Sequence, residues 1–556
     1  MPKYIPIIGL EIHAELKTNS KMFCSCPNNP YREAPNTNIC EVCLAHPGTL
    51  PVPNKQAIVD TVKIAKALNC KINKWSKFDR KQYFYPDLPK GYQISQYDQP
   101  IGERGFIDLD LRLTVNPRLA PKIGITRVHL EEDTAKLTHA MGRPEAHNVI
   151  LMSSERVTKD LANEKIDSSS AKGRTQNDSD AMGGTLVDFN RAGVPLVEIV
   201  SDPDIQSAVE AKAYCQELQT LLRYLGVSDA DMEKGQMRCE ANISVQEEGK
   251  FEIKKDDVKP VKGYELYPRV ELKNINSFRA IEKAIDYEIG RQTKMIEAGE
   301  TWRQQTRGWN DDAGETYLQR EKETSADYRY FPEPDIPPFE PEIIAGKIVL
   351  PELPAARRTR FHEEYGFSYA DAQLLTADEH WGNFTEEVMT ELAEWLASLP
   401  ESIKMAKKIT IQKQKELAKL AGGWISSKLM GAMADRKIDI RILKLRPENF
   451  AELIALIYGG RVNSTNAQKI IADMLDSGVD MDPTHIMEDK GYGQVSDAEK
   501  IGAIVDEVIK SYPEQVAQFR AGKEPIIKFL IGMAMKASEG SADPVVTEKL
   551  LRDKLI

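Results

Sequence analysis

The chain lacks the short motifs that mark several large enzyme classes in a sequence. It has no G-x-x-x-x-G-K-[ST] motif, so the use of ATP cannot be inferred from a P-loop. No G-x-G-x-x-G motif follows an expected strand, and no G-x-S-x-G nucleophile elbow occurs. Rossmann-type dinucleotide binding and serine-hydrolase chemistry are therefore not indicated.

Long apolar runs and a leader segment are also missing. No window approaches 18 uninterrupted apolar residues, which argues against a membrane span. The start, MPKYIPIIGLEIHAEL, lacks the basic stretch, apolar run and cleavage site of a secretory signal. We therefore expect a cytoplasmic protein without a membrane partner.

The balance of charge is acidic, with 74 Lys and Arg against 85 Asp and Glu and a formal net charge of −11. This excess argues against a protein that coats nucleic acid non-specifically. One locally basic domain can still bind RNA, because fields are screened over about 10 Å. The 556 residues are 41% hydrophobic and 29% charged, as expected of a globular protein with several domains.

Prolines divide the chain. Short alternating segments up to about Ala345 predict a largely antiparallel β architecture. Helical patterns interrupt it at residues 55–69, 207–225 and 278–297. The segment 331–343 contains five prolines and marks a boundary, because proline breaks regular helix.

Helical periods dominate beyond this boundary, and a second break separates the last helices from the middle ones. We predict an α+β protein with three parts: a β-rich cradle over 1–345, an all-helical middle domain over 346–487, and a small helical tail over 488–556. Residues 141–184 are polar, and we expect an inserted loop there with one helix near 153–163.

Four of the seven cysteines cluster in a C-x-C-x13-C-x2-C pattern, formed by Cys24, Cys26, Cys40 and Cys43. Two close pairs can surround one tetrahedral Zn²⁺ at about 2.3 Å. In a cytosolic protein such a cluster is more typical of a metal site than of disulfides. The alternative is four unmetallated thiols in a loop. A closed four-thiolate site leaves no place for substrate, so we predict a structural zinc.

Four segments alternate so that one face carries a mixture of carboxylate, imidazole, guanidinium and amide groups. These segments are 9–16, 125–133, 237–245 and 269–275. A sheet with one solvated side would explain the alternation without any function. We favour a functional face, because carboxylates and histidine suit a Mg²⁺ site that carries nucleotide phosphates. The candidates to meet the phosphate charge are Arg80, Lys81, Arg191 and Lys273.

Eight ordered segments resemble the B subunit of aspartyl/glutamyl-tRNA(Asn/Gln) amidotransferases, the GatB family. Besides the spaced cysteines they are GLEIHAELKTNSKMFC, HPGTLPVPN, DRKQYFYPDLPKGYQISQ, RVHLEEDTAKLTH, VDFNRAGVPLVEIVSDPD, ELKNINSF and DYRYFPEPD. The likeness covers nearly the whole chain, and the last helices are similar to the YqeY-like tail of that family.

The resemblance implies a carbon–nitrogen ligase in protein biosynthesis. ATP would phosphorylate the side-chain carboxylate of Glu or Asp misattached to tRNA(Gln) or tRNA(Asn). Ammonia would then displace the phosphate, giving Gln-tRNA(Gln) or Asn-tRNA(Asn). A glutaminase partner, GatA, would supply the ammonia, a small subunit, GatC, would brace the heterotrimer, and the helical parts would dock the tRNA.

The resemblance also carries residues across by motif. His13, Glu132 and Glu198 match the family's Mg²⁺ ligands, and Glu11 resembles a residue at the mouth of the ammonia tunnel. The four cysteines match the zinc-binding members. Strict alternation would place Glu132 on the face of Leu130, so we expect a bend after Leu130, with Glu131 as the alternative ligand.

Other functions remain possible at this point. A noncatalytic tRNA-binding scaffold would use the zinc loop and the helical tail to dock RNA, and would not need the acidic residues. A free-standing amidoligase would act on a small acid without tRNA. The archaeal glutamate-specific branch is less favoured, because residues 331–345 leave no room for an added domain.

Overall fold

The computed structural model describes residues 3–112, 114, 118, 120–139, 148–150, 184–254, 257–321, 328–398, 411–493, 498–538 and 542–555. The chain forms two compact units, residues 1–353 and 354–556. The helix expected near 153–163 lies outside the described residues. Among the described residues, no helix has both the length and the apolar character needed to cross a membrane.

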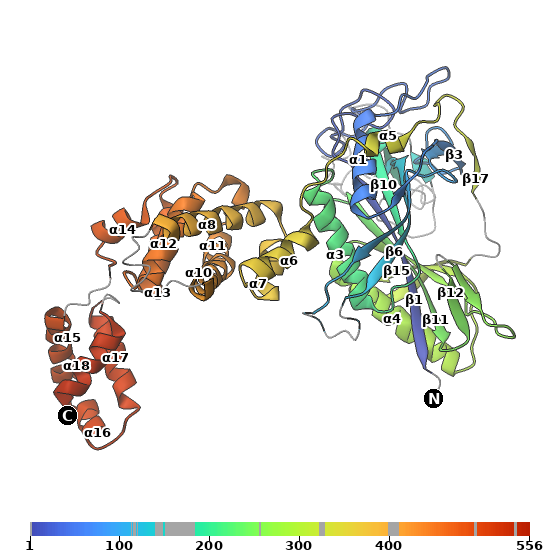
Figure 1. Cartoon of the computed structure of the whole chain (residues 1–556). Coiled ribbons are helices and arrows are strands. Elements are labelled where there is room, and N and C mark those ends of the chain that lie inside the picture. The colour runs from blue at the N-terminus through green and yellow to red at the C-terminus, as the bar shows by residue number, and fades with distance from the viewer. Residues whose placement is uncertain are drawn as a thin grey trace, which may run out of the picture. The chain divides into compact units, whose positions relative to one another are not determined.

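A nine-stranded sheet forms the centre of the first unit (Figure 1). Its order is β16-β15-β14-β11-β1-β10-β6-β5-β2, and every neighbouring pair is antiparallel except β14 and β15. The strands are β1 (Tyr4–Glu15), β2 (Lys71–Ile72), β5 (Gly102–Asp108), β6 (Lys122–Glu132), β10 (Pro195–Ser201), β11 (Met237–Glu247), β14 (Val270–Ile275), β15 (Gln305–Asn310) and β16 (Glu315–Glu321).

Three helices lie along this sheet at the positions predicted from the sequence. They are α1 (Lys55–Ala67), α3 (Ala208–Tyr224) and α4 (Phe278–Glu297). Each begins at an N-cap residue whose side chain accepts a hydrogen bond from a backbone N–H of the first turn. These N-cap residues are Asn54, Ser207 and Ser277. Their apolar faces join the buried face of the sheet in one core, so the other face of the strands is free to carry polar groups.

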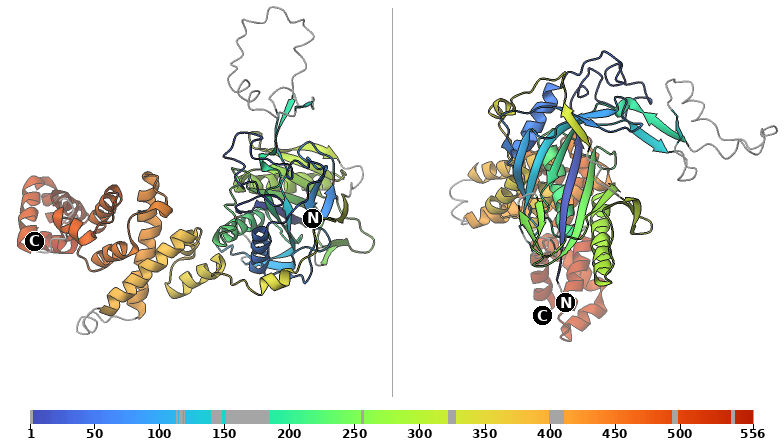
Figure 2. Two further views of the ribbon diagram at one scale, coloured as in Figure 1. Left: turned by 90° about the horizontal axis from the view of Figure 1, so that it is seen from above. Right: turned by 90° about the vertical axis from the view of Figure 1, so that its right-hand side faces the viewer.

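Smaller sheets flank the large one. The three-stranded sheet β17-β3-β4 contains β3 (Asp79–Gln82), β4 (Tyr92–Ser95) and β17 (Arg329–Pro332), and β4 packs on β6. Figure 2 shows the unit from two further directions. The other short elements are β7 (Lys136–His139), β8 (Asn148–Ile150), β9 (Gly184–Asp188), η1 (Phe189–Arg191), β12 (Phe251–Lys254), β13 (Asp257–Pro260) and α5 (Pro341–Ala345).

The second unit is helical throughout its described residues. Its buried apolar side chains form two clusters, one between Phe361 and Met487 and one between Ile501 and Leu555. Separate middle and tail domains would each have a core of this kind. The division itself stays a prediction. The helices are α6 (Pro354–Glu364), α7 (Tyr369–Leu375), α8 (Glu379–Ser398), α10 (Ile411–Trp424), η2 (Ile425–Leu429), α11 (Met430–Asp435), η3 (Ile440–Ile442), α12 (Pro447–Tyr458), α13 (Ser464–Asp476), α14 (Pro483–Asp489), α15 (Ala498–Ser511), α16 (Pro513–Arg520), α17 (Ile526–Ala537) and α18 (Pro544–Leu555).

Candidate functional site

Strand register brings distant polar residues together on one face of the large sheet. His13 of β1 lies opposite Glu198 of β10, and Glu198 lies opposite His129 of β6. Residues that pair across neighbouring strands point to the same face. Three segments far apart in the sequence therefore contribute to one cluster.

Three of these residues have ligand atoms within 4.8 Å of one another: His13, Glu131 and Glu198. The His13 Nε2 atom is 3.3 Å from a Glu198 oxygen and 3.7 Å from a Glu131 oxygen. Ser95 of β4, in the three-stranded sheet β17-β3-β4, donates a hydrogen bond of 2.9 Å to Glu131. One imidazole and two buried carboxylates form a donor set suited to a hard divalent cation.

Glu132 does not join this cluster. The expected bend after Leu130 is wrong, because β6 keeps its pairing register with β10 through Glu132. Regular alternation therefore turns Glu132 to the other side of the strand. Its carboxylate accepts hydrogen bonds from the Lys90 ammonium at 2.6 Å and from the Ile94 N–H at 2.9 Å. Glu131, the alternative ligand, takes the place assigned to Glu132.

Burial and mutual attraction perturb the charges of the cluster. Burial alone would lower the pKa of His13, but its hydrogen bond to Glu198 and the surrounding carboxylates raise it to about 9. Burial works to raise the pKa of Glu198, yet His129 and His13 hold it well below its usual value. Such opposed shifts are typical of functional sites.

Glu11 lies on the same face as His13 and, like it, is half-buried. Burial raises its pKa, and the nearby Glu198 and Glu240 raise it further. Its carboxylate accepts a hydrogen bond from the Asn242 amide at 3.2 Å. Glu11 is thus a carboxyl group beside the cluster that holds a proton more readily than an exposed one.

The four predicted phosphate-binding cations do not gather at one place. Lys81 faces the cluster, and the Glu131 and Glu198 charges raise its pKa against the effect of burial. Lys273 pairs with Glu240 at 2.9 Å and Glu271 at 3.4 Å on the same sheet.

The other two cations lie elsewhere. Arg80 points to the opposite side of β3 from Lys81 and binds Glu333 at 2.7 Å. Arg191 donates to the carbonyl oxygens of Thr134 and Ala135 and lies 3.5 Å from Asp133.

Sequence reasoning placed His129 and Arg127 on the polar face but gave them no role. The His129 Nε2 atom lies 3.1 Å from a Glu198 oxygen, and Arg127 donates to the other Glu198 oxygen at 3.3 Å. Both oxygens of the Glu198 carboxylate therefore have a partner from β6. Alternation along β6 could indicate their face, but only the pairing of β6 with β10 reveals their partner.

The four cysteines of the predicted zinc site converge. The Sγ atoms of Cys24, Cys26, Cys40 and Cys43 lie within 4.8 Å of one another, and all four are free of disulfides. The Cys24 thiol donates to the Cys43 sulfur and, with the charge of Lys21, lowers the pKa of Cys43 to about 5. Four converging sulfurs, one of them with a lowered pKa, fit a tetrahedral zinc ion.

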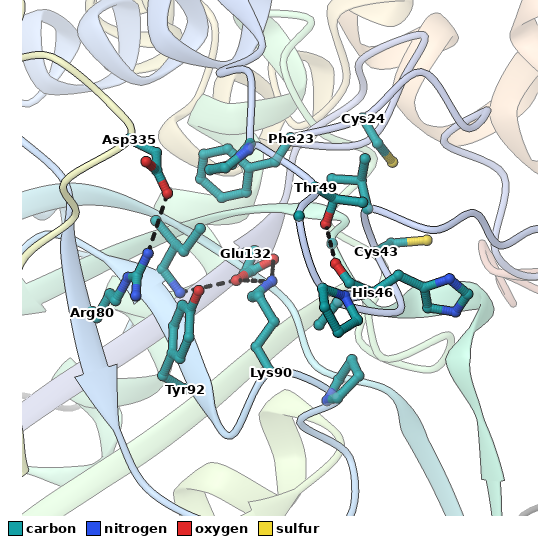
Figure 3. Close-up of a pocket in the computed structure, with 18 residues that line it drawn as sticks. Phe23, Cys24, Cys43, His46, Thr49, Arg80, Lys90, Tyr92, Glu132 and Asp335 are labelled. Atoms are coloured by element: carbon teal, nitrogen blue, oxygen red, sulfur yellow. Dashed lines mark hydrogen bonds and ion pairs between the residues drawn. The ribbon is translucent and has the colours of Figure 1, made fainter.

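A cavity of about 270 Å³ lies beside the cysteine loop (Figure 3). Its lining residues come from the loop over 42–51, from the segment between Pro89 and Ile94, and from Glu132 and Asp335. Arg80 and Lys90 are the cations in its wall. The cavity is thus where Glu132 and Arg80 lie, on the other side of their strands from Glu131 and Lys81.

Comparison with known proteins identifies the family of the chain. A family profile described as "GatB/GatE catalytic domain" matches residues 6–344, which is more than half of the chain. A second profile, described as "GatB domain", matches residues 407–555. The chain belongs to the GatB family. The first match spans the large sheet, the cysteine cluster and the cavity.

Relatives in the GatB family match along nearly their whole length. The B subunit of the aspartyl/glutamyl-tRNA(Asn/Gln) amidotransferase of Rippkaea orientalis is 41% identical over 100% of this chain and 98% of its own. The protein of the same name from Thermosynechococcus vestitus is 41% identical over 99% and 96%. That of Dehalococcoides mccartyi is 40% identical over 100% and 98%.

Lys21 of this GatB-family chain gives a test of the cysteine site. Its side chain has no exposed surface, and its Nζ atom donates to the Asn38 carbonyl oxygen at 2.9 Å and lies 3.9 Å from the Cys43 Sγ atom. In the part of the chain that the structure describes, no carboxylate oxygen lies within ion-pair distance of it. A buried ammonium needs an anionic partner, and the sulfur of Cys43 is the group placed to supply that charge.

We expect Lys21→Met to weaken zinc binding about 10–100-fold, as loss of a group that supports the ligands does. Competition with a chelator measures the affinity. Lys17→Met is the matched control, because Lys17 is exposed and pairs with Asp229. Equal zinc affinity in the two variants would show that Lys21 does not support the site.

Proposed function

We propose that the chain is the subunit that activates the substrate in an ATP-dependent, tRNA-dependent amidotransferase. It would phosphorylate the side-chain carboxylate of Glu on tRNA(Gln), of Asp on tRNA(Asn), or of both, and then convert it to the amide. The observation that carries the proposal is the convergence of His13, Glu131 and Glu198 on the polar face of the large sheet. Membership of the GatB family supports the choice of substrate.

His13, Glu131 and Glu198 fit a magnesium ion, since their oxygens and imidazole nitrogen are ligands that such a cation accepts. When bound, magnesium would supply positive charge that offsets the repulsion between the ATP phosphates and the substrate carboxylate. His129, Arg127 and Ser95 hold the two carboxylates in place through the contacts described above. Preorganised ligands of this kind cost little reorganisation during the reaction.

The proposed reaction has two steps. A carboxylate oxygen of the amino acid attacks the γ-phosphorus of ATP, and ADP leaves. Ammonia then attacks the carbonyl carbon, the C–O bond to phosphate breaks, and the nitrogen loses one proton. Lys81 faces the site where phosphate charge develops, and Glu11, whose pKa is raised, is suited to accept the proton.

The complete enzyme would be a cytoplasmic heterotrimer with GatA as the glutaminase and GatC as the small subunit. Ammonia must arrive unprotonated to act as a nucleophile, which favours delivery from a partner over uptake from water. Zinc at the four cysteines would be structural, because four thiolates leave no open ligand position.

The experiment is an ATP-cleavage and amidation assay on the purified complex with Glu-tRNA(Gln), Asp-tRNA(Asn) and free glutamate. We expect phosphate transfer with at least one misacylated tRNA and none with free glutamate. Turnover of free glutamate alone would identify an amidoligase for small acids. His13→Ala should lower phosphate transfer, whereas full activity in this variant would favour the noncatalytic scaffold.

A further inference from the structure

The cysteine cluster holds a loop that has little else to stabilise it. Residues 16–54, all of which the structure describes, form no helix or strand. Between residues 17 and 54 only Met22, Phe23 and Cys43 are buried apolar side chains. A segment without a core of its own depends on the ligands that tie it to a metal. A chemical change at the four thiols should therefore change the shape of the loop.

Two of the four cysteines, Cys40 and Cys43, form a C-x2-C pair within one turn of the backbone. The Leu44 N–H closes this turn by donating to the Cys40 carbonyl oxygen at 3.0 Å. The two Sγ atoms are 3.8 Å apart, and the Cys40 N–H donates to the Cys43 sulfur at 3.1 Å. The C-x2-C spacing is the one that dithiol–disulfide proteins use. A disulfide of about 2.05 Å therefore needs only a small movement of the two side chains.

The surroundings of the C-x2-C pair favour its oxidation. The Lys21 ammonium lies 3.9 Å from the Cys43 sulfur, and cysteines that react with oxidants typically lie beside a positive charge and near solvent. Cys24 and Cys43 line the cavity beside the loop (Figure 3), and Cys40 is half-buried, so a small oxidant can reach the cluster. Cys215, in contrast, is fully buried in the core of the first unit.

We propose that Cys40 and Cys43 form an oxidation site that controls zinc binding and, through the loop, the activity of the enzyme. Hydrogen peroxide oxidises one sulfur to a sulfenic acid as its O–O bond breaks and hydroxide leaves. The second sulfur then attacks the first, water leaves, and the disulfide forms. In the net change two thiols and one peroxide give one disulfide and two waters. A dithiol reductant reverses the step by exchange, and disulfides in cytosolic proteins are typically transient and redox-sensing.

Hydrogen bonds connect the loop to the carboxylate–histidine cluster of the large sheet. The Met22 N–H of the loop donates to the Gly193 carbonyl oxygen at 2.6 Å, and the Gly193 N–H donates to the Asp133 carbonyl oxygen at 2.9 Å. Asp133 follows β6 directly, two residues after Glu131. Opening the loop should therefore disturb the end of a strand that carries a proposed magnesium ligand. This effect on phosphate transfer rests on the proposed function, whereas the oxidation itself does not.

Titration of the zinc-loaded complex with hydrogen peroxide tests the proposal. We expect release of about one zinc ion per chain, together with a Cys40–Cys43 disulfide in the peptide mass spectrum. Phosphate transfer should fall at least about tenfold, as is usual when the support of a metal site is lost, and should return after treatment with a dithiol and zinc. Zinc release without this disulfide, or without loss of phosphate transfer, would overturn the proposal.

Two histidine variants test whether the C-x2-C pair is responsible. Histidine can replace cysteine as a zinc ligand, so Cys40→His keeps a fourth ligand but removes one sulfur of the pair. Cys26→His makes the same change at a ligand outside the pair. We expect peroxide to release zinc at least about tenfold more slowly from Cys40→His than from Cys26→His, because an oxidised Cys43 then lacks its neighbouring thiol. Equal rates would contradict the assignment. If either variant fails to hold zinc, the mass spectrum of the oxidised wild type decides.

The measurements separate this inference from the proposed function. Zinc release and disulfide formation need no substrate, so both can occur in a complex that does not amidate tRNA, and that result would sink the proposed function alone. An active complex that keeps its zinc under peroxide and forms no Cys40–Cys43 disulfide would sink the oxidation site alone. Cys70→Ala is the control outside the cluster, since Cys70 is half-buried, and it should change neither zinc release nor activity.

Discussion

Glu131→Gln should lower kcat for tRNA-dependent phosphate transfer about 10²–10³-fold, the range expected when a preorganised charged group is removed from a reaction site. Glutamine keeps the size of the side chain but removes the charge that faces His13 at 3.7 Å. The loss should appear in single-turnover measurements of phosphate transfer and in a higher requirement for Mg²⁺. Binding of tRNA should persist, because Glu131 is only 2% exposed and offers almost no surface for the tRNA to contact.

Two variants make this result specific. Glu132→Gln alters the neighbouring residue of the same strand, which binds Lys90 in the cavity. It should preserve the Mg²⁺ requirement of the wild type. Glu300→Gln, at an exposed position after α4, should change neither quantity. If Glu132→Gln instead raised the Mg²⁺ requirement and Glu131→Gln did not, the assignment of ligands from strand register would be wrong.

Asp133→Asn should destabilise the first unit by about 3–5 kcal/mol, the usual cost of removing one partner from a buried ion pair. Asp133 is buried directly after β6 and pairs with Arg238 of β11 and with Arg191. The change removes the anion shared by both guanidinium groups and leaves Arg238 with only Glu15, at 3.6 Å. Hydrogen exchange at the amides of β6 and β10 would report the loss locally.

The same carboxylate predicts a pH dependence. Burial works to raise the pKa of Asp133, but Arg238 and Arg191 lower it to about 2. A folded-state pKa below the ordinary value of 3.8 stabilises the fold above about pH 4. About 2 kcal/mol is then lost as the pH falls from about 4 to about 2. Asp133→Asn should remove this slope.

Asp229→Asn is the matched control, since Asp229 is exposed and forms a surface pair with Lys17. It should cost no more than about 1 kcal/mol. Similar destabilisation by both aspartate variants would contradict the role given to the buried pair.

Local pattern was enough to predict the elements that carry the site. Alternation identified β1, β6, β11 and β14, and helical spacing identified α1, α3 and α4 within about two residues at their ends. These predictions succeeded because one side of each element is buried against a single core, which imposes the period on the sequence.

The contacts between elements could not be predicted from the sequence. Nothing local indicates that β10 lies between β1 and β6, and that order alone brings Glu198 between His13 and His129. Alternation alone did place the side chains of Glu131 and Glu132 on opposite faces of β6. The expected bend was an error that came from matching the family motif. The burial of Lys21 depends on a loop that closes over it, for which the sequence offers no periodic signal.

The central place of β1 has a consequence for biosynthesis. This strand pairs with β11 on one side, with Tyr4 opposite Glu247, so partners about 240 residues apart must meet. At about 5–20 residues per second, translation takes about 10–50 s to reach them. Until β10 (Pro195–Ser201) is made, both edges of β1 are unpaired, and the edge that pairs with β11 stays unpaired throughout this time. A chaperone that binds extended segments should therefore bind β1 in the nascent chain. Slowing translation before β10 should increase aggregation of the nascent chain.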